Sequence, residues 1–402
     1  MKLNPLKKIL DAVPAAVMRK DVPAPLRRRV WVEIDLEALV RNYEKIAERA
    51  KPAQVLGVLK ANAYGLGVKP YAKALAKAGC RMFGVAEPFE ALELLGIARE
   101  LGRPDIQILS SVLPDEIPEM VRKGVILPII GLEEARLVSE AATRFGVPAR
   151  VHFKIDSGMG RLGIPMEDAL ETMRAVRELP GLDCEGIFSH CPMAYDPHDP
   201  FTPRQIQRFK KLVEAAEADG FAFKKIHIAA SDAINNFPQC FEPPFNVVRT
   251  GINLHGSFDP NGRRALSVEP VLALKTRIAQ VRTLAPGTTL GYGRTWCLKE
   301  PTRVATISAG YADGLPLALA NRSQVLIKGV RCPVIGRVSM DYTTVDASLV
   351  PNPQPGDEVV CLGRSGGETV TPDDWAALKG THAYDIICSL GSRVERVAVG
   401  AF

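Results

Sequence analysis

The sequence predicts an α/β protein with an N-terminal TIM-type (β/α)8 barrel followed by a mostly β C-terminal domain. From Val55 to Arg249, short apolar runs rich in β-branched residues alternate with longer runs of helical period. After about Gly256 the pattern changes to Val-, Ile- and Thr-rich runs separated by Gly, Pro-Gly and Asp-Gly turns. The length of 402 residues, 47% of them hydrophobic, allows two such domains, each with its own core.

Eight strands are expected in the barrel, and helical segments lie between them. Several of these segments open with Pro or acidic residues and end near Gly. The strands are expected to begin at Val55, Phe83, Ile106, Val125, Arg150, Glu185, Lys225 and Asn246. Eight alternations favour a closed barrel over an open sheet. A doubly wound open sheet remains the alternative, because Pro128 weakens the fourth strand.

Three segments are expected along the chain. Residues 1–29 form a basic arm, residues 30–262 the barrel domain and residues 263–402 the β domain. A short strand at 30–36 precedes the first strand of the barrel and could instead pair with the β domain.

The net charge of +6 comes from the arm, which holds eight basic and two acidic residues. Because the rest of the chain is balanced, no nucleic-acid partner is expected. The apolar stretch of the arm is interrupted by Asp11 and Pro14, which argues against a secretory signal. No window is long enough for a membrane span. Eight cysteines without Cys-x-x-Cys spacing are typical of a reducing compartment, so a cytoplasmic protein is expected.

Lys60 is the first candidate for chemistry, because it ends an apolar strand and begins a loop with Tyr64, Gly65 and Gly67. A lysine at the end of a strand is usually just solvated. Here its amine would lie at a water-restricted barrel mouth beside a phenol. This is the setting that a lysine bound to pyridoxal phosphate requires.

Two further loops follow the ends of expected strands. KIDSGMGRLG contains Lys154 and Arg161, and the guanidinium of Arg161 can bind a carboxylate or a phenolate. His190 and His227 follow the sixth and seventh strands. A single buried histidine is usually structural, but two at successive strand ends favour a site. They lack the spacing of metal ligands and no carboxylate joins them, so no metal is expected.

The loop after the eighth strand and the β domain complete the set of candidates. Arg249 is followed by Gly251 and Ile252, whose backbone N–H groups suit a phosphorylated cofactor at this end of a barrel. Tyrosines in β domains mostly pack in the core. Tyr292 and Tyr311 are flanked by Gly or turn residues, which favours exposure near a cleft.

These motifs together resemble those of the bacterial alanine racemases, pyridoxal phosphate enzymes with a TIM barrel and a β domain. The resemblance runs from about Val30 to Val397 and keeps the order VLKANAYG, KIDSGMGRLG, NVVRTGINLHG, GYGR, GRVSMDY and THAYDIICSLGSRVERV. It implies a head-to-tail homodimer with shared active sites and a small amino acid as substrate. The product would be D-alanine for peptidoglycan, although breakdown of L-alanine would use the same reaction.

The resemblance also implies a role for individual residues at the cofactor. Lys60 would bind the cofactor covalently, and Arg249, linked to His190, would bond its pyridine nitrogen. The phosphate would be held by Tyr64, Ser231, Gly251, Ile252 and Tyr384.

Further residues would act on the substrate. Arg161 and the Met340 backbone would hold its carboxylate, Tyr311 would narrow the entrance, and Lys154 is at a position that some relatives carbamylate. Racemisation removes a proton from one face of the α-carbon and returns one to the other face, so two bases fit better than one. Lys60 would serve one face and Tyr292 of the partner subunit the other.

Three alternatives to an alanine racemase can be compared with it at the same residues. A broad-specificity or serine-preferring racemase would keep the same chemistry. A barrel-type decarboxylase would place an acid at the ring nitrogen, where this chain has Arg249. A non-catalytic cofactor carrier would lack the β domain with Tyr292.

Three residues depart from the family pattern. Leu66 takes the place of a usual histidine, Ala230 that of an asparagine and His255 that of a tyrosine. The loss of the asparagine amide puts the geometry around the phosphate in question.

Overall fold

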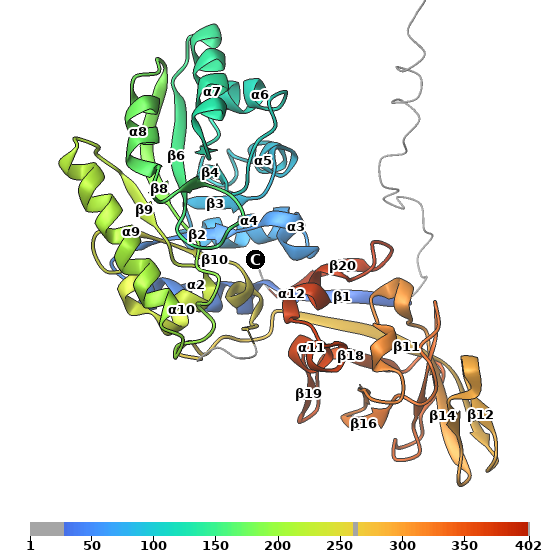
Figure 1. Cartoon of the computed structure of the whole chain (residues 1–402). Helices are drawn as coiled ribbons and strands as arrows, with labels where there is room; N and C mark the ends of the chain where they lie inside the picture. The colour runs from blue at the N-terminus through green and yellow to red at the C-terminus, as the bar shows by residue number, and fades with distance from the viewer. Residues whose placement is uncertain (1–27, 260–263, 401–402) are drawn as a thin grey trace, which may run out of the picture.

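The computed structural model describes residues 28–259 and 264–400, so most of the basic arm and the expected boundary at 262–263 lie outside the described residues. Figure 1 shows a barrel of alternating strands and helices, followed by a β-rich part. This arrangement confirms the predicted fold class. Of the arm, Arg28 is described, and its guanidinium pairs with Glu395 at 2.7 Å.

Eight parallel strands form the barrel within the described residues, each where the alternation predicts a strand. They are β2 Gln54–Val58, β3 Met82–Val85, β4 Asp105–Ile108, β5 Leu127–Ile129, β6 Ala149–Asp156, β8 Leu182–Phe188, β9 Lys225–His227 and β10 Val247–Thr250. A bridge from Gln107 to Ile126 joins β4 to β5. A bond of 3.1 Å from the Asn246 N–H to the Ile226 carbonyl joins β10 to β9. The sheet therefore closes on itself, which excludes the open doubly wound alternative.

Helices cover the outside of the barrel (Figure 1). They are α2 Leu36–Ala50, α3 Lys60–Tyr64, α4 Val68–Lys77, α5 Pro88–Leu95, α6 Ile117–Lys123, α7 Leu132–Phe145, α8 Ala169–Arg177, α9 Phe201–Ala218 and α10 Ser231–Asn236. In α2, Asp35 caps the first turn by accepting from the Ala38 N–H at 2.8 Å, and Leu39 and Ile46 are buried. In the two described ranges, no helix has the length and apolar composition needed to cross a bilayer.

The second part is built on a nine-stranded sheet with the central order β16-β15-β18-β11-β1-β20. The strands of this part are β1 Val30–Asp35, β11 Leu272–Leu284, β12 Thr289–Leu290, β13 Trp296–Cys297, β14 Thr302–Ile307, β15 Gln324–Ile327, β16 Val330–Pro333, β17 Thr343–Asp346, β18 Glu358–Ser365, β19 Glu368–Val370 and β20 Glu395–Val399. Strand β1 pairs antiparallel with β11 and parallel with β20. The first described strand thus lies in the sheet of the β domain, and the chain then enters the barrel.

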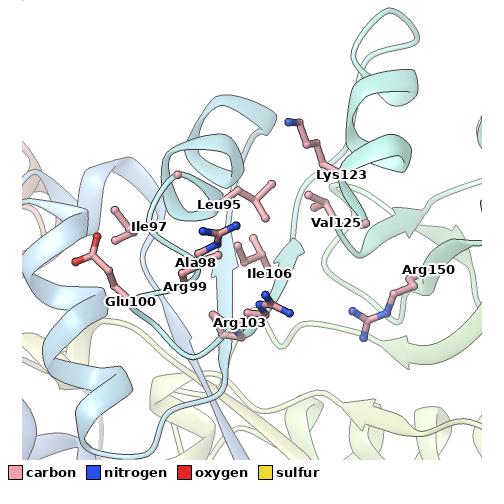
Figure 2. A pocket seen from close by; sticks show the side chains of 13 residues that line it. Leu95, Ile97, Ala98, Arg99, Glu100, Arg103, Ile106, Lys123, Val125 and Arg150 are labelled. Carbon is pink, nitrogen blue, oxygen red and sulfur yellow. The ribbon is translucent and has the colours of Figure 1, made fainter.

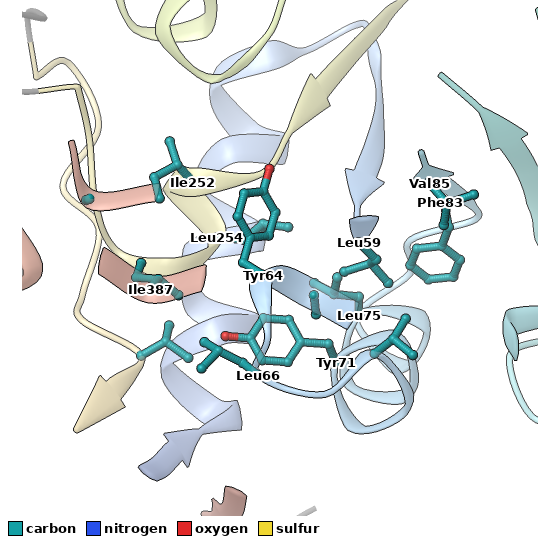
Figure 3. Close-up of a cluster of buried hydrophobic side chains, with 14 of the residues drawn as sticks. Leu59, Tyr64, Leu66, Tyr71, Leu75, Phe83, Val85, Ile252, Leu254 and Ile387 are labelled. Atoms are coloured by element: carbon teal, nitrogen blue, oxygen red, sulfur yellow. The ribbon is translucent and has the colours of Figure 1, made fainter. Parts of the chain in front are cut away.

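A buried cluster joins the two parts beside the Lys60 loop (Figure 3). Tyr64 and Tyr71 from the barrel pack near Ile387 of α12 Ala383–Cys388, a short helix of the β domain. Leu66, one of the departures from the family pattern, is fully buried in this cluster. His255, another departure, bonds through Nδ1 to the Tyr71 hydroxyl at 2.9 Å. Leu66 and His255 are therefore part of the buried surroundings of Tyr64.

Candidate active site

The candidate residues of the barrel gather at the carboxyl ends of its strands. Lys60 follows β2, and Lys154 is near the end of β6. His190 follows β8, and Arg249 is the next-to-last residue of β10. Because parallel strands present their carboxyl ends at one rim, these side chains share one barrel mouth.

The turn after Lys60 is left-handed. Ala61, Asn62, Ala63 and Tyr64 all have φ between 51° and 58°. Each such residue costs about 1–2 kcal/mol, so the turn must be held by its surroundings. The Asn62 side chain accepts from the Val68 N–H at 2.7 Å, and the Ala61 N–H donates to the carboxylate of Glu90.

Glu90 clamps this turn to the neighbouring loop. Its second oxygen accepts from the Ala86 N–H, at the end of β3, at 2.7 Å. From the β domain, Arg396 donates to the Gly65 carbonyl at 2.9 Å. The position of Lys60 is thus fixed by the next barrel loop and by the β domain together.

Lys60 lies at the rim of the barrel and is an exposed residue. Burial by the surrounding protein lowers the pKa of Lys60, and the positive charges of Arg161 and Arg249 lower it further. Glu90 and Cys388 act in the opposite direction. The net shift increases the fraction of neutral amine at neutral pH, which is the form that acts as a nucleophile or a base.

A narrow cradle lies beside this turn, between Tyr64 and Gly251. A Cβ at residue 251 would lie 2.1 Å from the Tyr64 phenolic oxygen, so only glycine fits there. The Ser231 hydroxyl accepts from the Gly251 N–H at 3.1 Å. The ring of Tyr384, from α12, lies 5.9 Å from the ring of Tyr64.

These groups form a site rich in hydroxyl donors. Burial raises the pKa of Tyr64 and that of Tyr384, so both phenols stay protonated at neutral pH. Ile252 follows Gly251 and begins a 3-10 turn. Ala230, the third departure from the family pattern, leaves α10 without a side-chain cap, yet Ser231 keeps its bond to the neighbouring loop. The cradle fits a phosphate group.

Arg249 is buried below the mouth. Its Nη1 lies 2.7 Å from Nδ1 of His227, and its Nη2 lies 3.2 Å from Nδ1 of His190. Burial and the charge of Arg249 lower the pKa of His190 to about 3, so His190 is neutral and accepts this bond. Burial also lowers the pKa of Arg249, to about 10, which leaves it charged at neutral pH.

Arg161 is at the end of a preformed loop after β6. The Asp156 carboxylate accepts from the N–H groups of Gly158, Met159, Gly160 and Arg161 at 2.9–3.1 Å. A Cβ at Gly163 would lie 2.7 Å from the Asp156 nitrogen, so glycine is required there too. The loop leaves the Arg161 side chain exposed at the mouth.

Lys154 lies deeper and donates to the Leu109 carbonyl at 2.6 Å. Burial, together with the charges of Arg161 and Arg249, lowers the pKa of Lys154 to about 8. Its neutral form is therefore well populated near neutral pH, as reaction with carbon dioxide requires.

Three predicted residues lie away from this mouth in the same chain. Tyr292 is 74% exposed on a loop next to β12, in the part of Figure 1 farthest from the barrel. Tyr311 and Met340 are also exposed, and they lie side by side because the Ala312 N–H donates to the Met340 carbonyl at 3.1 Å. One chain alone does not bring Tyr292 to Lys60.

A separate hollow lies elsewhere in the described part of the barrel. A cavity of about 770 Å³ opens at the amino ends of the barrel strands, lined by residues that include Arg99, Arg103, Lys123 and Arg150 (Figure 2). No candidate residue lines it, and barrels place their chemistry at the opposite rim.

Sequence reasoning missed three residues that shape the site. Glu90 reads as an ordinary acid in the first turn of α5, while His152 and Glu185 read as residues of buried strands. One signal was available for the last two, because a histidine or a carboxylate inside an apolar strand needs a polar partner.

Both parts of the chain match models of known families. The model "Alanine racemase, N-terminal domain" matches residues 34–259, and "Alanine racemase, C-terminal domain" matches residues 271–398. The chain is 37% identical to the alanine racemase of Syntrophobacter fumaroxidans over 364 residues, which cover 90% of this chain and 95% of that protein.

Solved structures show the same similarity. The alanine racemase from Streptomyces coelicolor has a TM-score of 0.87 and 33% identity, covering 93% of this chain and 98% of that one. The alanine racemase from Bartonella henselae, with covalently bound pyridoxal phosphate, has a TM-score of 0.83 and 28% identity. That match covers 93% of this chain and 100% of that one.

Proposed function

The chain belongs to the alanine racemase family, and we propose that it is a pyridoxal phosphate-dependent isomerase that interconverts L-alanine and D-alanine. One observation carries the proposal beyond family membership. A lysine with a lowered pKa, a cradle of hydroxyl donors and a buried arginine share one barrel mouth. D-Alanine made in this way would supply peptidoglycan.

The residues present fit the cofactor. The Tyr64 hydroxyl lies directly against the Gly251 backbone, and together with the hydroxyls of Ser231 and Tyr384 it would hold a phosphate group placed beside them. The Tyr64 hydroxyl donates to no described residue, and neither does Nε of Arg249, so both donors are available to a ligand. When bound, pyridoxal phosphate supplies an electron-withdrawing ring that stabilises negative charge at the α-carbon.

Lys60 would take up or deliver the α-proton at one face of the substrate. Its lowered pKa favours the neutral amine that accepts a proton. Arg161 would bind the substrate carboxylate with its planar guanidinium, since it is exposed at the rim on a preformed loop.

Arg249 would hold the pyridine nitrogen through a donated hydrogen bond. An arginine stays charged and has no proton to give up at neutral pH, so the ring nitrogen would remain unprotonated. Beside Arg249 the bound cofactor would withdraw electrons less strongly than beside a carboxylate partner, which would limit side reactions.

The second base would come from a partner subunit. Tyr292 is exposed and far from Lys60 of its own chain, and Tyr311 and Met340 are exposed too. In a head-to-tail homodimer these exposed groups of one β domain would complete the barrel mouth of the other chain. We place the enzyme in the cytoplasm, because its eight cysteines are all unpaired.

The test is proton NMR of the cofactor-loaded enzyme in D2O with a panel of L-amino acids, together with optical rotation. Loss of the α-proton signal with loss of rotation, fastest for alanine, is expected. Equal exchange across larger side chains would indicate a broad-specificity racemase. An absence of exchange with every amino acid would overturn the proposed function.

A further inference from the structure

Arg249 is a buried cation whose described hydrogen-bond partners are all uncharged. Its Nη2 donates to the carbonyls of Ser189 and Ile228 at 2.7 and 3.2 Å. The remaining partners are Nδ1 of His190 and Nδ1 of His227. A buried charge needs compensation, and within the described residues no carboxylate touches this guanidinium.

A line of buried side chains connects Arg249 to a carboxylate. Nε2 of His227 lies 3.5 Å from Nδ1 of His152. Nε2 of His152 makes no hydrogen bond to a described residue, and the carboxylate oxygen Oε1 of Glu185 lies 3.5 Å from it. Both histidines are 0% exposed and Glu185 is 4% exposed. The two longer contacts are at the outer limit of a hydrogen bond, so small movements make or break them.

Arg249 at one end and Glu185 at the other determine which atom donates in each contact of this line. Arginine can only donate, so Nδ1 of His227 must be the bare nitrogen and its proton is on Nε2. That proton points to Nδ1 of His152, which must also be bare. The proton of His152 is then on Nε2, facing a carboxylate that can only accept.

The protonation states agree with this direction. Burial lowers the pKa of His152 and that of His227, for which the charge of Arg249 adds to the effect, so both rings are neutral. Burial opposes ionisation of Glu185, but hydrogen bonds from His152 and Arg150 outweigh it and hold its pKa at about 2. Glu185 is therefore an acceptor at neutral pH.

The barrel interior is shaped to hold this line in place. A Cβ at Gly186 would lie 2.6 Å from Nε2 of His152, so the glycine makes room for the ring. Glu185 is held by Arg150 at 2.8 Å, and Arg150 is held by Asp105 at 2.8 Å. Arg150 borders the cavity at the opposite rim, so the line crosses the barrel from one end to the other (Figure 2).

We propose that His152 and Glu185 are positioning residues for Arg249, acting through His227 in a hydrogen-bond relay of fixed direction. The relay aims the guanidinium at the ring nitrogen of the cofactor and places a compensating negative charge two imidazoles away. This inference rests on the proposed function for what Arg249 binds. The direction of the relay itself does not depend on it.

The test compares the cofactor-loaded enzyme with Glu185→Leu and Glu185→Gln by 15N NMR of histidine-labelled protein. A protonated and a bare ring nitrogen have well-separated 15N shifts, and His152 and His227 are assigned through Leu variants. We expect the wild type to show both rings protonated at Nε2. Glu185→Leu should change this state at His152, whose Nε2–H loses its acceptor, and should leave His227 protonated at Nε2, because Arg249 still donates to its Nδ1. Glu185→Gln should keep both states, because the amide oxygen still accepts.

Two further readouts report on Arg249. Glu185→Leu should shift the absorbance of the bound cofactor and lower kcat about tenfold with little change in KM, as expected when a buried donor loses its acceptor. The control is Asp105→Asn, which removes another carboxylate bonded to Arg150 but does not touch His152. Its tautomers, absorbance and kcat should match the wild type.

The proposal is wrong if Glu185→Leu folds and leaves the His152 tautomer and the absorbance unchanged, or if Asp105→Asn changes them equally. If Glu185→Leu does not fold, Arg150→Met/Glu185→Leu replaces the whole ion pair with apolar groups and is measured in the same way. A wild type with the expected tautomers but no racemisation would overturn the proposed function and leave the relay standing.

Discussion

Tyr64 and Gly251 approach each other so closely that a single added carbon on residue 251 would lie 2.1 Å from the phenolic oxygen. Tyr64 reaches this position through a left-handed turn, and Gly251 follows the last strand of the barrel. The contact joins the first and last loops of the barrel at the cradle assigned to the phosphate. The phosphate site therefore depends on the absence of a side chain at residue 251 as much as on the hydroxyl groups that donate hydrogen bonds.

Gly251→Ala should therefore weaken cofactor binding. The new methyl group must push Tyr64 aside, and each 1.4 kcal/mol lost weakens binding about tenfold. We expect a rise in the Kd for pyridoxal phosphate of about tenfold or more, measured by fluorescence titration of the apoenzyme. Gly131→Ala is the control, since an added Cβ there meets nothing within 4 Å and Gly131 has an extended φ of 179°. Equal Kd values for the two variants would contradict the cradle.

Lys154 should react reversibly with carbon dioxide. Its neutral amine attacks the carbon, a C–N bond forms and one proton is released, which leaves a carbamate. With a pKa of about 8, the neutral fraction and the yield should rise as the pH increases through 8.

The measurement for Lys154 is 13C NMR with labelled bicarbonate. A carbamate signal is expected in the wild type and in Lys60→Ala, and it should disappear in Lys154→Gln. A signal that persists in Lys154→Gln belongs to another amine. Silence in the wild type at pH 8 and high bicarbonate would rule the modification out.

Arg150→Met should destabilise the protein, because it leaves Glu185 buried without its ion partner. Breaking a buried pair on one side costs about 3–5 kcal/mol. The wild-type contribution of Glu185 is present above its unfolded pKa and is lost as the pH falls toward its folded pKa of about 2.

Without Arg150 the folded pKa of Glu185 should rise. The ionised Glu185 then adds less to the free energy of unfolding above its unfolded pKa. The thermal unfolding midpoint should therefore depend less on pH between about 5 and 2. Thermal unfolding across this range checks both effects. Arg122→Met, which removes an exposed pair with Glu119, should change little. A similar small change for Arg150→Met would contradict the role assigned to the pair.

Tyr292→Phe should impair proton exchange at one face of alanine while leaving cofactor absorbance intact. The substitution removes only the hydroxyl and keeps the ring, and it changes none of the residues assigned to holding the cofactor, so the cofactor should remain bound. A positioned acid or base contributes about 100-fold to 10,000-fold. Exchange into D2O is therefore expected to fall by that factor from one enantiomer, followed by NMR. An equal and small decrease from both enantiomers would contradict the assignment.

The fold could be predicted because its signals are local. Alternating strands and helices, and the rule that barrels act at strand ends, were enough to select Lys60, Lys154 and Arg249. The left-handed turn after Lys60 could not be predicted, since residues such as Ala61 have no local preference for it and contacts to Glu90 hold it.

The deeper part of the site was hidden for a similar reason. His152 and Glu185 are on different strands, and in the sequence each looks like an ordinary residue of a buried strand. Only the closed barrel brings His152 Nε2 within 3.5 Å of Glu185 Oε1. Tyr384 meets Tyr64 from the other domain, which only tertiary structure shows. Family resemblance assigned Tyr384 to the phosphate site, whereas residue patterns alone did not.

The central claim is that each active site combines Lys60 of one chain with Tyr292 of another. Mixing the inactive Lys60→Ala and Tyr292→Phe enzymes under conditions that exchange subunits tests it directly. Each mixed dimer would contain one site with both native residues, so about a quarter of wild-type activity per site should return. If Tyr292 acted on its own chain, no site would be restored, and a mixture as inactive as its two components would contradict the account.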